Sequence, residues 1–174
     1  HRNQCRAITV DGSINVHLSG RFHHSICSGA DLPATGDFVN ISPLFVDEQN
    51  SNAAVLQEVL PRRSKISRIG SGPGIAEQVL VANVDFAFIV TSANNDFSIN
   101  RLQRFVLLAK EGNVTPVILL SKVDLVEDST ILVSEIAERL GELEIVLVSS
   151  VLDIGFEKLR EKLVPGSTSV FLGS

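Results

Sequence analysis

The sequence predicts two domains of different class: a small all-β barrel over residues 1–69 and an α/β domain with a parallel sheet over residues 70–174. In the first part, short apolar runs with a period of two are separated by turn residues. In the second part, continuous apolar runs alternate with apolar stripes at helical spacing. Between them lies the glycine-rich segment 70–74, a composition typical of a joint between domains.

Five short strands are predicted in the first domain, and Asp11-Gly12 predicts a hairpin turn between the first two. A small closed barrel of five strands is most simply an oligonucleotide-binding (OB-fold) barrel. An SH3-like barrel remains an alternative, because periodicity does not reveal topology. The predicted strands span residues 4–10, 13–18, 21–26, 37–41 and 53–60.

Four strands are predicted in the second domain, and the first two of them are continuous apolar runs, which indicate strands buried on both faces. Stripes at i, i+3, i+4 and i+7 predict a helix around Leu102–Ala109 and another around Val133–Leu140, and a third follows Phe156. This alternation predicts a parallel sheet between layers of helices, in which ligands bind at the carboxyl ends of the strands. The predicted strands span residues 84–91, 117–120, 145–148 and 169–172.

The composition excludes several classes of protein. With 44% hydrophobic residues the 174-residue chain is not a disordered segment, and no apolar run reaches the roughly 18 residues of a membrane span. Two cysteines, Cys5 and Cys27, make no disulfide framework, so we expect a cytoplasmic protein. No metal site is expected in this chain, since its histidines lack partners at ligand spacing.

The net charge of −5 is unevenly distributed along the chain. Residues 1–70 carry seven basic and six acidic groups, a balance of +1, whereas residues 71–174 carry eight and fourteen, a balance of −6. A basic cluster in the first part is either a solvated linker or a contact for an RNA backbone. Its members are Arg62, Arg63, Lys65 and Arg68.

Two segments at predicted strand ends suggest recognition of guanine. In Ser121-Lys122-Val123-Asp124 the carboxylate can accept two hydrogen bonds from the guanine edge, while the Lys122 stem lies along the base. The backbone of Ser149-Ser150 can meet the guanine O6 atom. The alternative is a Lys122–Asp124 pair that caps the following helix. The last predicted strand ends in Gly173-Ser174, as strands do before a phosphate-binding loop.

The order of these segments resembles the circularly permuted, ribosome-small-subunit-dependent GTPases, the RsgA (YjeQ) family. In ordinary small GTPases the phosphate loop precedes the base-reading motif, whereas here a barrel comes first, then the base-reading motif, then the start of a phosphate loop. The resemblance extends over nearly the whole chain. It rests on residues 32–39, 60–68, 78–85, 89–92, 96–97, 100–105, 121–124, 165–168 and 172–174.

By position, the resemblance places Ser121, Lys122, Val123 and Asp124 on the guanine-specificity motif. Ser149 and Ser150 fall on the loop that supports the base, and Gly173 and Ser174 on the start of the phosphate loop. Ser121 stands where the family usually has Asn or Thr, and a shorter side chain can lose a tether to the phosphate loop. Ser150 stands where a small apolar residue is common.

The resemblance implies an OB-fold RNA-binding domain over residues 1–69 and the first portion of a permuted GTPase domain over residues 70–174. It implies GTP hydrolysis late in the maturation of the small ribosomal subunit, with that subunit, its rRNA and GTP or GDP as partners. Mg²⁺ and a structural Zn²⁺ are implied for the full-length protein, with ligands beyond Ser174. We therefore expect a cytoplasmic monomer, and this chain alone to be inactive as a GTPase.

One alternative function remains open at this point. The first domain can be an RNA-binding module attached to an α/β domain that no longer binds nucleotide. Two features favour this alternative: Ser121 stands in place of Asn or Thr, and the sequence contains only the start of a phosphate loop.

Overall fold

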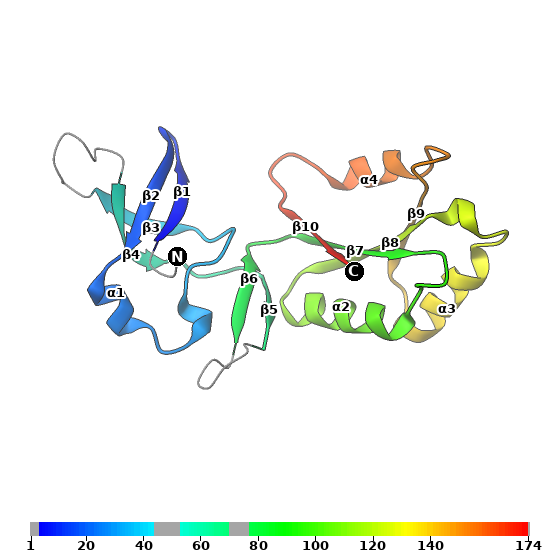
Figure 1. Ribbon diagram of the computed structural model, residues 1–174, viewed down its shortest axis with the longest axis horizontal. Coiled ribbons are helices and arrows are strands. Elements are labelled where there is room, and N and C mark those ends of the chain that lie inside the picture. Colours follow the sequence, from blue (N-terminus) through cyan, green and yellow to red (C-terminus); the bar gives the residue numbers. More distant parts are fainter. Residues whose placement is uncertain (1–3, 44–52, 70–76, 174) are drawn as a thin grey trace. The chain divides into compact units, whose positions relative to one another are not determined.

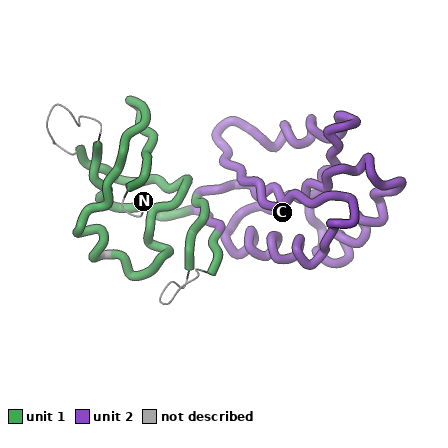
Figure 2. Tube along the Cα trace, in the orientation of Figure 1, with its two compact units in different colours: residues 1–62, 67–82 green, residues 63–66, 83–174 purple. Residues whose placement is uncertain are grey.

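The computed structural model describes residues 4–43, 53–69 and 77–173, which belong to two compact units (Figure 2). The first unit contains residues 1–62 and 67–82, and the second contains residues 63–66 and 83–174. The division expected after residue 69 therefore falls inside the first unit, which also includes strand β6 (Gln78–Ala82). The glycine-rich segment 70–74 lies outside the described residues.

A four-stranded sheet with the order β1-β2-β4-β3 forms most of the first unit. Strands β1 (Gln4–Thr9) and β2 (Gly12–Leu18) make the predicted hairpin, in which Thr9 pairs with Gly12 around Val10 and Asp11. Strand β4 (Ala53–Val59) is parallel to β2 and antiparallel to β3 (Val39–Pro43). The core of this unit consists of Val16, Phe22, Ala54 and Leu56.

The strand predicted over residues 21–26 is wrong, because this segment forms helix α1 (Gly20–Ser25). The Ser19 hydroxyl accepts a hydrogen bond from the Phe22 amide at 3.0 Å and so caps the first turn. Phe22 is buried in the core, whereas His23 and His24 are exposed. One buried side chain in this short segment gives no periodicity, so the pattern could not distinguish a strand from a helix.

Two further strands follow the four-stranded sheet along the chain. Strand β5 (Lys65–Arg68) and strand β6 form a two-stranded sheet. Within the first unit, Gly36 adopts a φ of +89° and lies so close to the backbone of Ala82 that a Cβ atom would be 2.2 Å from its carbonyl oxygen. A glycine is therefore required where this loop passes β6.

The second unit has the predicted parallel sheet, with the strand order β10-β7-β8-β9 (Figure 1). Its strands are β7 (Phe86–Ser92), β8 (Thr115–Ser121), β9 (Glu144–Val148) and β10 (Ser169–Gly173). Its helices are α2 (Ile99–Glu111), α3 (Thr130–Leu140) and α4 (Phe156–Lys162).

Helices cover both faces of this sheet, as the sequence predicts. Residues of α2 and α3 pack with Ile89 and Ile118 on one face, whereas Leu159 of α4 packs against Phe88 and Val146 on the other. Strands β7 and β8 bury alternate residues in the two layers, which explains why they appear as continuous apolar runs, whereas β10 at the edge of the sheet has no fully buried residue. Among the described residues, no helix is long and apolar enough to cross a membrane.

Candidate functional site

The polar segments after the strands of the second unit lie at one edge of its sheet, because the strands are parallel. Ser121 at the end of β8 pairs with Ser92 of β7, and Gly173 at the end of β10 pairs with Val90 of β7. The carboxyl ends of all four strands therefore meet along this edge (Figure 1). This is the edge at which open α/β sheets bind their ligands.

The chain turns sharply where it leaves β8. Lys122 adopts the left-handed conformation with φ 57° and ψ 38°, and a short 3₁₀ turn, η2 (Val123–Leu125), follows it. The Ser121 hydroxyl donates a hydrogen bond to the Thr91 carbonyl oxygen at 2.9 Å, and the Ala93 amide donates to the Ser121 carbonyl oxygen at 2.7 Å. Ser121 thus joins the ends of β7 and β8, and Lys122 is exposed in front of them.

The two predicted guanine-reading segments contact each other directly through Asp124 and Ser149. The Ser149 hydroxyl, which is only 1% exposed, donates a hydrogen bond to Asp124 Oδ1 at 2.5 Å. The same hydroxyl accepts a hydrogen bond from the Leu152 amide at 3.1 Å. A buried serine therefore fixes both the half-buried carboxylate and the loop after β9, and Ser150 is exposed next to it.

The alternative in which Lys122 and Asp124 only cap the following helix does not fit these contacts. At the start of α3, Asp128 Oδ1 accepts hydrogen bonds from the amide and the hydroxyl of Thr130, at 2.8 and 2.6 Å. The Thr130 hydroxyl and amide lower the pKa of the Asp128 carboxyl. Because Asp128 accepts the hydrogen bonds at the start of α3, Asp124 is not needed there. Most of the acceptor positions of the Asp124 carboxylate are therefore available to other partners.

A glycine that the sequence analysis did not single out fixes the loop after β9. Ser149 and Ile154 exchange two backbone hydrogen bonds, and Gly155 follows with a φ of +84°. A Cβ atom at Gly155 would lie 1.9 Å from the Leu147 carbonyl oxygen. Asp153-Ile154-Gly155 in the sequence is the signal that could have predicted such a turn, since Asp and Gly tolerate positive φ. Asp153 also has a positive φ, of 53°.

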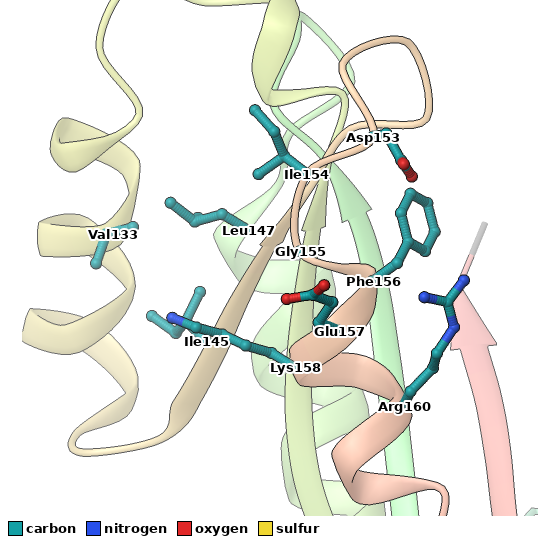
Figure 3. A pocket seen from close by; sticks show the side chains of 10 residues that line it. All are labelled: Val133, Ile145, Leu147, Asp153, Ile154, Gly155, Phe156, Glu157, Lys158 and Arg160. Carbon is teal, nitrogen blue, oxygen red and sulfur yellow. The ribbon is translucent and has the colours of Figure 1, made fainter.

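A cavity of about 600 Å³ lies next to this loop, between α3, β9 and α4 (Figure 3). Val133, Leu147 and Phe156 are among its apolar lining residues, and Lys158 extends from α4 toward Ile145. Neither the Ser121–Asp124 segment nor Ser149 lines it. This cavity is therefore distinct from the edge that holds the guanine-reading residues.

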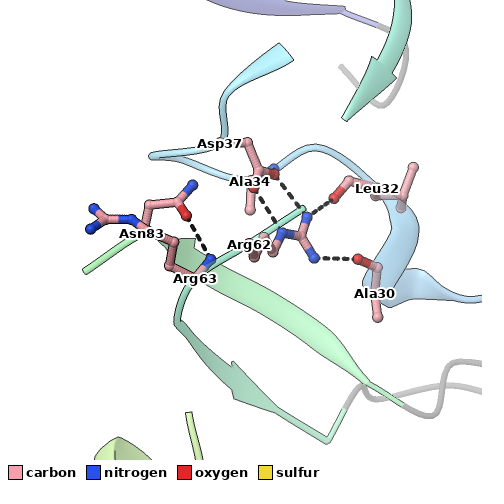
Figure 4. A network of polar contacts seen from close by, with 7 residues as sticks. All are labelled: Ala30, Leu32, Ala34, Asp37, Arg62, Arg63 and Asn83. Carbon is pink, nitrogen blue, oxygen red and sulfur yellow. Dashed lines mark hydrogen bonds and ion pairs between the residues drawn. The ribbon is translucent and has the colours of Figure 1, made fainter. Parts of the chain in front are cut away.

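The expected RNA contact at Arg62 is not supported, because this side chain is an internal structural residue of the first unit (Figure 4). Its guanidinium contacts both carboxylate oxygens of Asp37, at 2.7 and 2.8 Å, and the carbonyl oxygens of Ala30 and Leu32. The Arg62 side chain is 14% exposed and that of Asp37 is 2% exposed. The hydrogen bond to Asp37 raises the pKa of Arg62. Its nitrogens are therefore engaged inside the protein.

The other members of the basic cluster are more accessible. Arg63 belongs to the second unit, where its side chain is 67% exposed and lies 3.8 Å from Asp85. Lys65 is half-buried at the start of β5, and Arg68 is exposed at its end, where it donates to Gln78 at 3.1 Å. The structure thus separates the internal Arg62 and the half-buried Lys65 from two exposed bases, Arg63 and Arg68. The predicted Gly173 is exposed at the end of β10, and Ser174 lies outside the described residues.

Comparison with known proteins identifies relatives of the whole chain. The family model described as RsgA GTPase matches residues 59–174. A protein of Methanosarcina acetivorans named small ribosomal subunit biogenesis GTPase RsgA is 31% identical over the whole chain, which covers 45% of that protein. The chain spans a little less than half the length of the curated relatives it matches.

Two solved structures are similar in fold. The crystal structure of YjeQ from Thermotoga maritima is similar over the whole of this chain, which covers 57% of the YjeQ chain. The TM-score is 0.68 and the sequence identity is 28%. The crystal structure of YloQ, described as a circularly permuted GTPase, is similar over 98% of this chain and 55% of the YloQ chain. The TM-score is 0.60 and the sequence identity is 24%. The similarity to YloQ shows a shared fold only.

Proposed function

The chain belongs to the RsgA GTPase family, and on this basis we propose that it forms the base-reading part of a GTPase that acts in maturation of the small ribosomal subunit. The observation that supports this proposal most directly is the contact between Asp124 and Ser149. It brings together the two segments that the guanine hypothesis requires. We place the activity of the full-length protein in the cytoplasm, with GTP, the small subunit and its rRNA as partners.

Asp124 is the residue that distinguishes guanine from adenine in this proposal. Guanine presents an N1–H and an amino group side by side, and a carboxylate can accept both hydrogen bonds. Adenine has no such pair of donors at that edge. Ser149 occupies one acceptor position of the carboxylate and holds its orientation, and the remaining positions are available for the base. The Lys122 stem covers one face of the base.

Gly173 and Ser174 are proposed to begin the loop that binds the phosphate end of the nucleotide, and Gly173 ends β10 at the same edge of the sheet as Asp124. Phosphoryl transfer needs charge neutralisation by groups around the phosphates, a metal ion among them. Among the described residues, no group of His, Cys, Asp or Glu could hold a metal ion. Mg²⁺ and Zn²⁺ are proposed here for the full-length protein only.

The first unit is proposed to bind rRNA through an OB-fold-type surface. Its four-stranded sheet and the exposed base Arg68 support this proposal. Arg62 has no part in it, because its guanidinium is held by Asp37. Family membership supports a ribosomal partner, since the relative from Methanosarcina acetivorans is named for biogenesis of the small subunit.

A second candidate function is an RNA-binding module whose α/β domain does not bind nucleotide. The hydrogen bond from Ser121 to the Thr91 carbonyl oxygen favours it, because this hydroxyl is engaged within the sheet rather than directed toward a phosphate loop. An α/β domain in which residue 121 does not contact the phosphate loop can keep its fold and no longer bind nucleotide.

Calorimetric titration of the full-length gene product with GDP and with ADP separates the two candidates. We expect GDP to bind at micromolar concentration or below, and ADP at least about 100-fold more weakly, because two charge-assisted hydrogen bonds are lost. The variant Asp128→Asn serves as a control, since that carboxylate serves α3, and its GDP affinity should match the wild type. Absence of GDP binding would favour the second candidate.

A further inference from the structure

A second cavity of the second unit lies at the amino edge of its sheet, opposite the edge with Asp124. Its volume is about 700 Å³. The lining residues precede or begin three strands: Asp85 comes just before β7, Thr115 begins β8, and Ser167 lies shortly before β10. Arg63, Ser64 and Asn113 complete the polar part of the lining. Neither the family's base motif nor the proposed phosphate loop contributes to it.

The walls of this cavity are held in place by hydrogen bonds. Asp85 Oδ2 accepts a hydrogen bond from the Thr168 amide at 2.8 Å, and the Asp85 carbonyl oxygen accepts one from the Thr115 amide at 3.0 Å. The Asn113 side-chain amide donates to the Arg63 carbonyl oxygen at 3.1 Å. A ligand here would meet a preformed polar surface, which reduces the entropy cost of binding.

The interior of the cavity favours groups that donate hydrogen bonds. Helices α2 and α4 both end shortly before lining residues, so the partial negative charge of their carboxyl ends is directed to this edge. The Asp85 carboxylate, with a side chain 34% exposed, adds a full negative charge. A phosphate inside the cavity would be repelled, whereas a hydroxyl group could donate to the carboxylate.

Arg63 supplies a positive charge at the rim. Its side chain is 67% exposed, and its guanidinium lies 3.8 Å from Asp85 Oδ1. An exposed pair at that distance contributes little to stability, so Arg63 can turn toward an incoming anion. A guanidinium has several further donors that match phosphate oxygens.

We infer that this cavity binds one ribonucleotide of an RNA strand, with its 2′-hydroxyl donating to Asp85 and its phosphate at Arg63. A ribose and its adjacent phosphate need a hydrogen-bond acceptor and a cation next to each other. Asp85 and Arg63 supply these two groups. The 2′-hydroxyl is the group by which a protein distinguishes RNA from DNA. The inference rests on the part of the proposed function that makes RNA a partner, and it is independent of GTP.

Fluorescence anisotropy of the full chain with labelled ten-nucleotide oligouridylate tests this site. We expect the RNA to bind about 10- to 100-fold more tightly than the matched oligodeoxyuridylate, the ratio for one hydrogen bond to a charged group. A 2′-O-methyl oligouridylate cannot donate that bond and should bind like the DNA. In Asp85→Asn the amide oxygen can still accept from Thr168, while the RNA-to-DNA ratio should fall several-fold, because the partner of the 2′-hydroxyl is then an uncharged amide.

Arg63→Ala should weaken RNA and DNA binding alike, and it should lower the salt slope of log K by about 0.7. The matched control is Arg139→Ala, an exposed arginine of α3, whose slope should equal the wild type. An Asp85→Asn protein that keeps the full RNA-to-DNA ratio, or equal binding of all three probes by the wild type, would overturn the inference. GDP titration of the same proteins reports separately on the proposed nucleotide site.

Discussion

Asp37 and Asp124 show how two aspartates in one chain come to have different roles. In the first unit, Asp37 is 2% exposed and accepts hydrogen bonds from the Ala34 amide and from two nitrogens of Arg62. In the second unit, Asp124 is half-buried and accepts from the Ser149 hydroxyl. Asp37 is enclosed by its partners, whereas Asp124 is oriented by one partner and accessible to a ligand.

The difference shows that burial and acceptor capacity, rather than residue type, separate a structural carboxylate from a binding one. A buried carboxylate whose acceptor positions are filled stabilises a loop, and removing its partner leaves an uncompensated charge. A fixed carboxylate with open positions at a sheet edge is suited to bind donors. The variants below probe the two situations, in order of decreasing expected effect.

Arg62→Ala should be the most destabilising substitution. It removes the partner of a buried carboxylate, which typically lowers the free energy of unfolding by about 3–5 kcal/mol. The neighbouring variant Arg63→Ala is the matched control, and it should change stability by less than about 1 kcal/mol because its ion pair is exposed. Urea denaturation followed by circular dichroism measures both. Equal stabilities of the two variants would mean that Asp37 and Arg62 do not hold the first unit.

Gly155→Ala should distort the loop that positions Ser149. The added Cβ atom would meet the Leu147 carbonyl oxygen in a residue with φ +84°, so we expect a loss of about 2–3 kcal/mol and weaker GDP binding. Gly141→Ala is a control with a φ of +77° and no atom within 4 Å of the new Cβ. It should also destabilise the protein, by about 1–3 kcal/mol because φ 77° with ψ −167° is a conformation that few residues besides glycine adopt, but it should leave GDP affinity unchanged. If both variants behave alike in denaturation and titration, the close contact at Gly155 has no role in the site.

Ser149→Ala should weaken GDP binding and also loosen the loop after β9, because the Leu152 amide loses its partner. The substitution removes the hydroxyl that orients Asp124, and the loss of one hydrogen bond to a charged group corresponds to about a 10-fold lower affinity. Ser150→Ala is the control, because that side chain is exposed and has no role in holding Asp124. Calorimetry with GDP compares them. An unchanged affinity in Ser149→Ala would show that Asp124 needs no orienting partner.

The α/β unit and its site could be predicted from the sequence to a large extent. Continuous apolar runs identify strands that are covered on both faces, and the ends of parallel strands necessarily meet at one edge. The prediction that Asp124 and Ser149 lie close together follows from this rule alone. The hydrogen bond between them, and the engagement of Ser121 by Thr91, depend on side-chain geometry that no pattern contains.

The first unit was predicted less well, for two physical reasons. Residues 21–26 bury Phe22 alone in the core, so the apolar pattern was too short to reveal helix α1. The role of Arg62 depends on Asp37, which lies 25 residues away along the chain. A cluster of basic residues in the sequence therefore could not show that one of its members is internal.

The variant Asp124→Asn of the full-length gene product tests the central claim, that this carboxylate reads guanine. An amide has one acceptor oxygen and one donor group, so it pairs with xanthine, in which a carbonyl replaces the guanine amino group. Calorimetric titration should show GDP affinity reduced by at least about 100-fold and xanthosine diphosphate binding improved by a similar factor. Unchanged affinity for GDP in this variant would contradict the account.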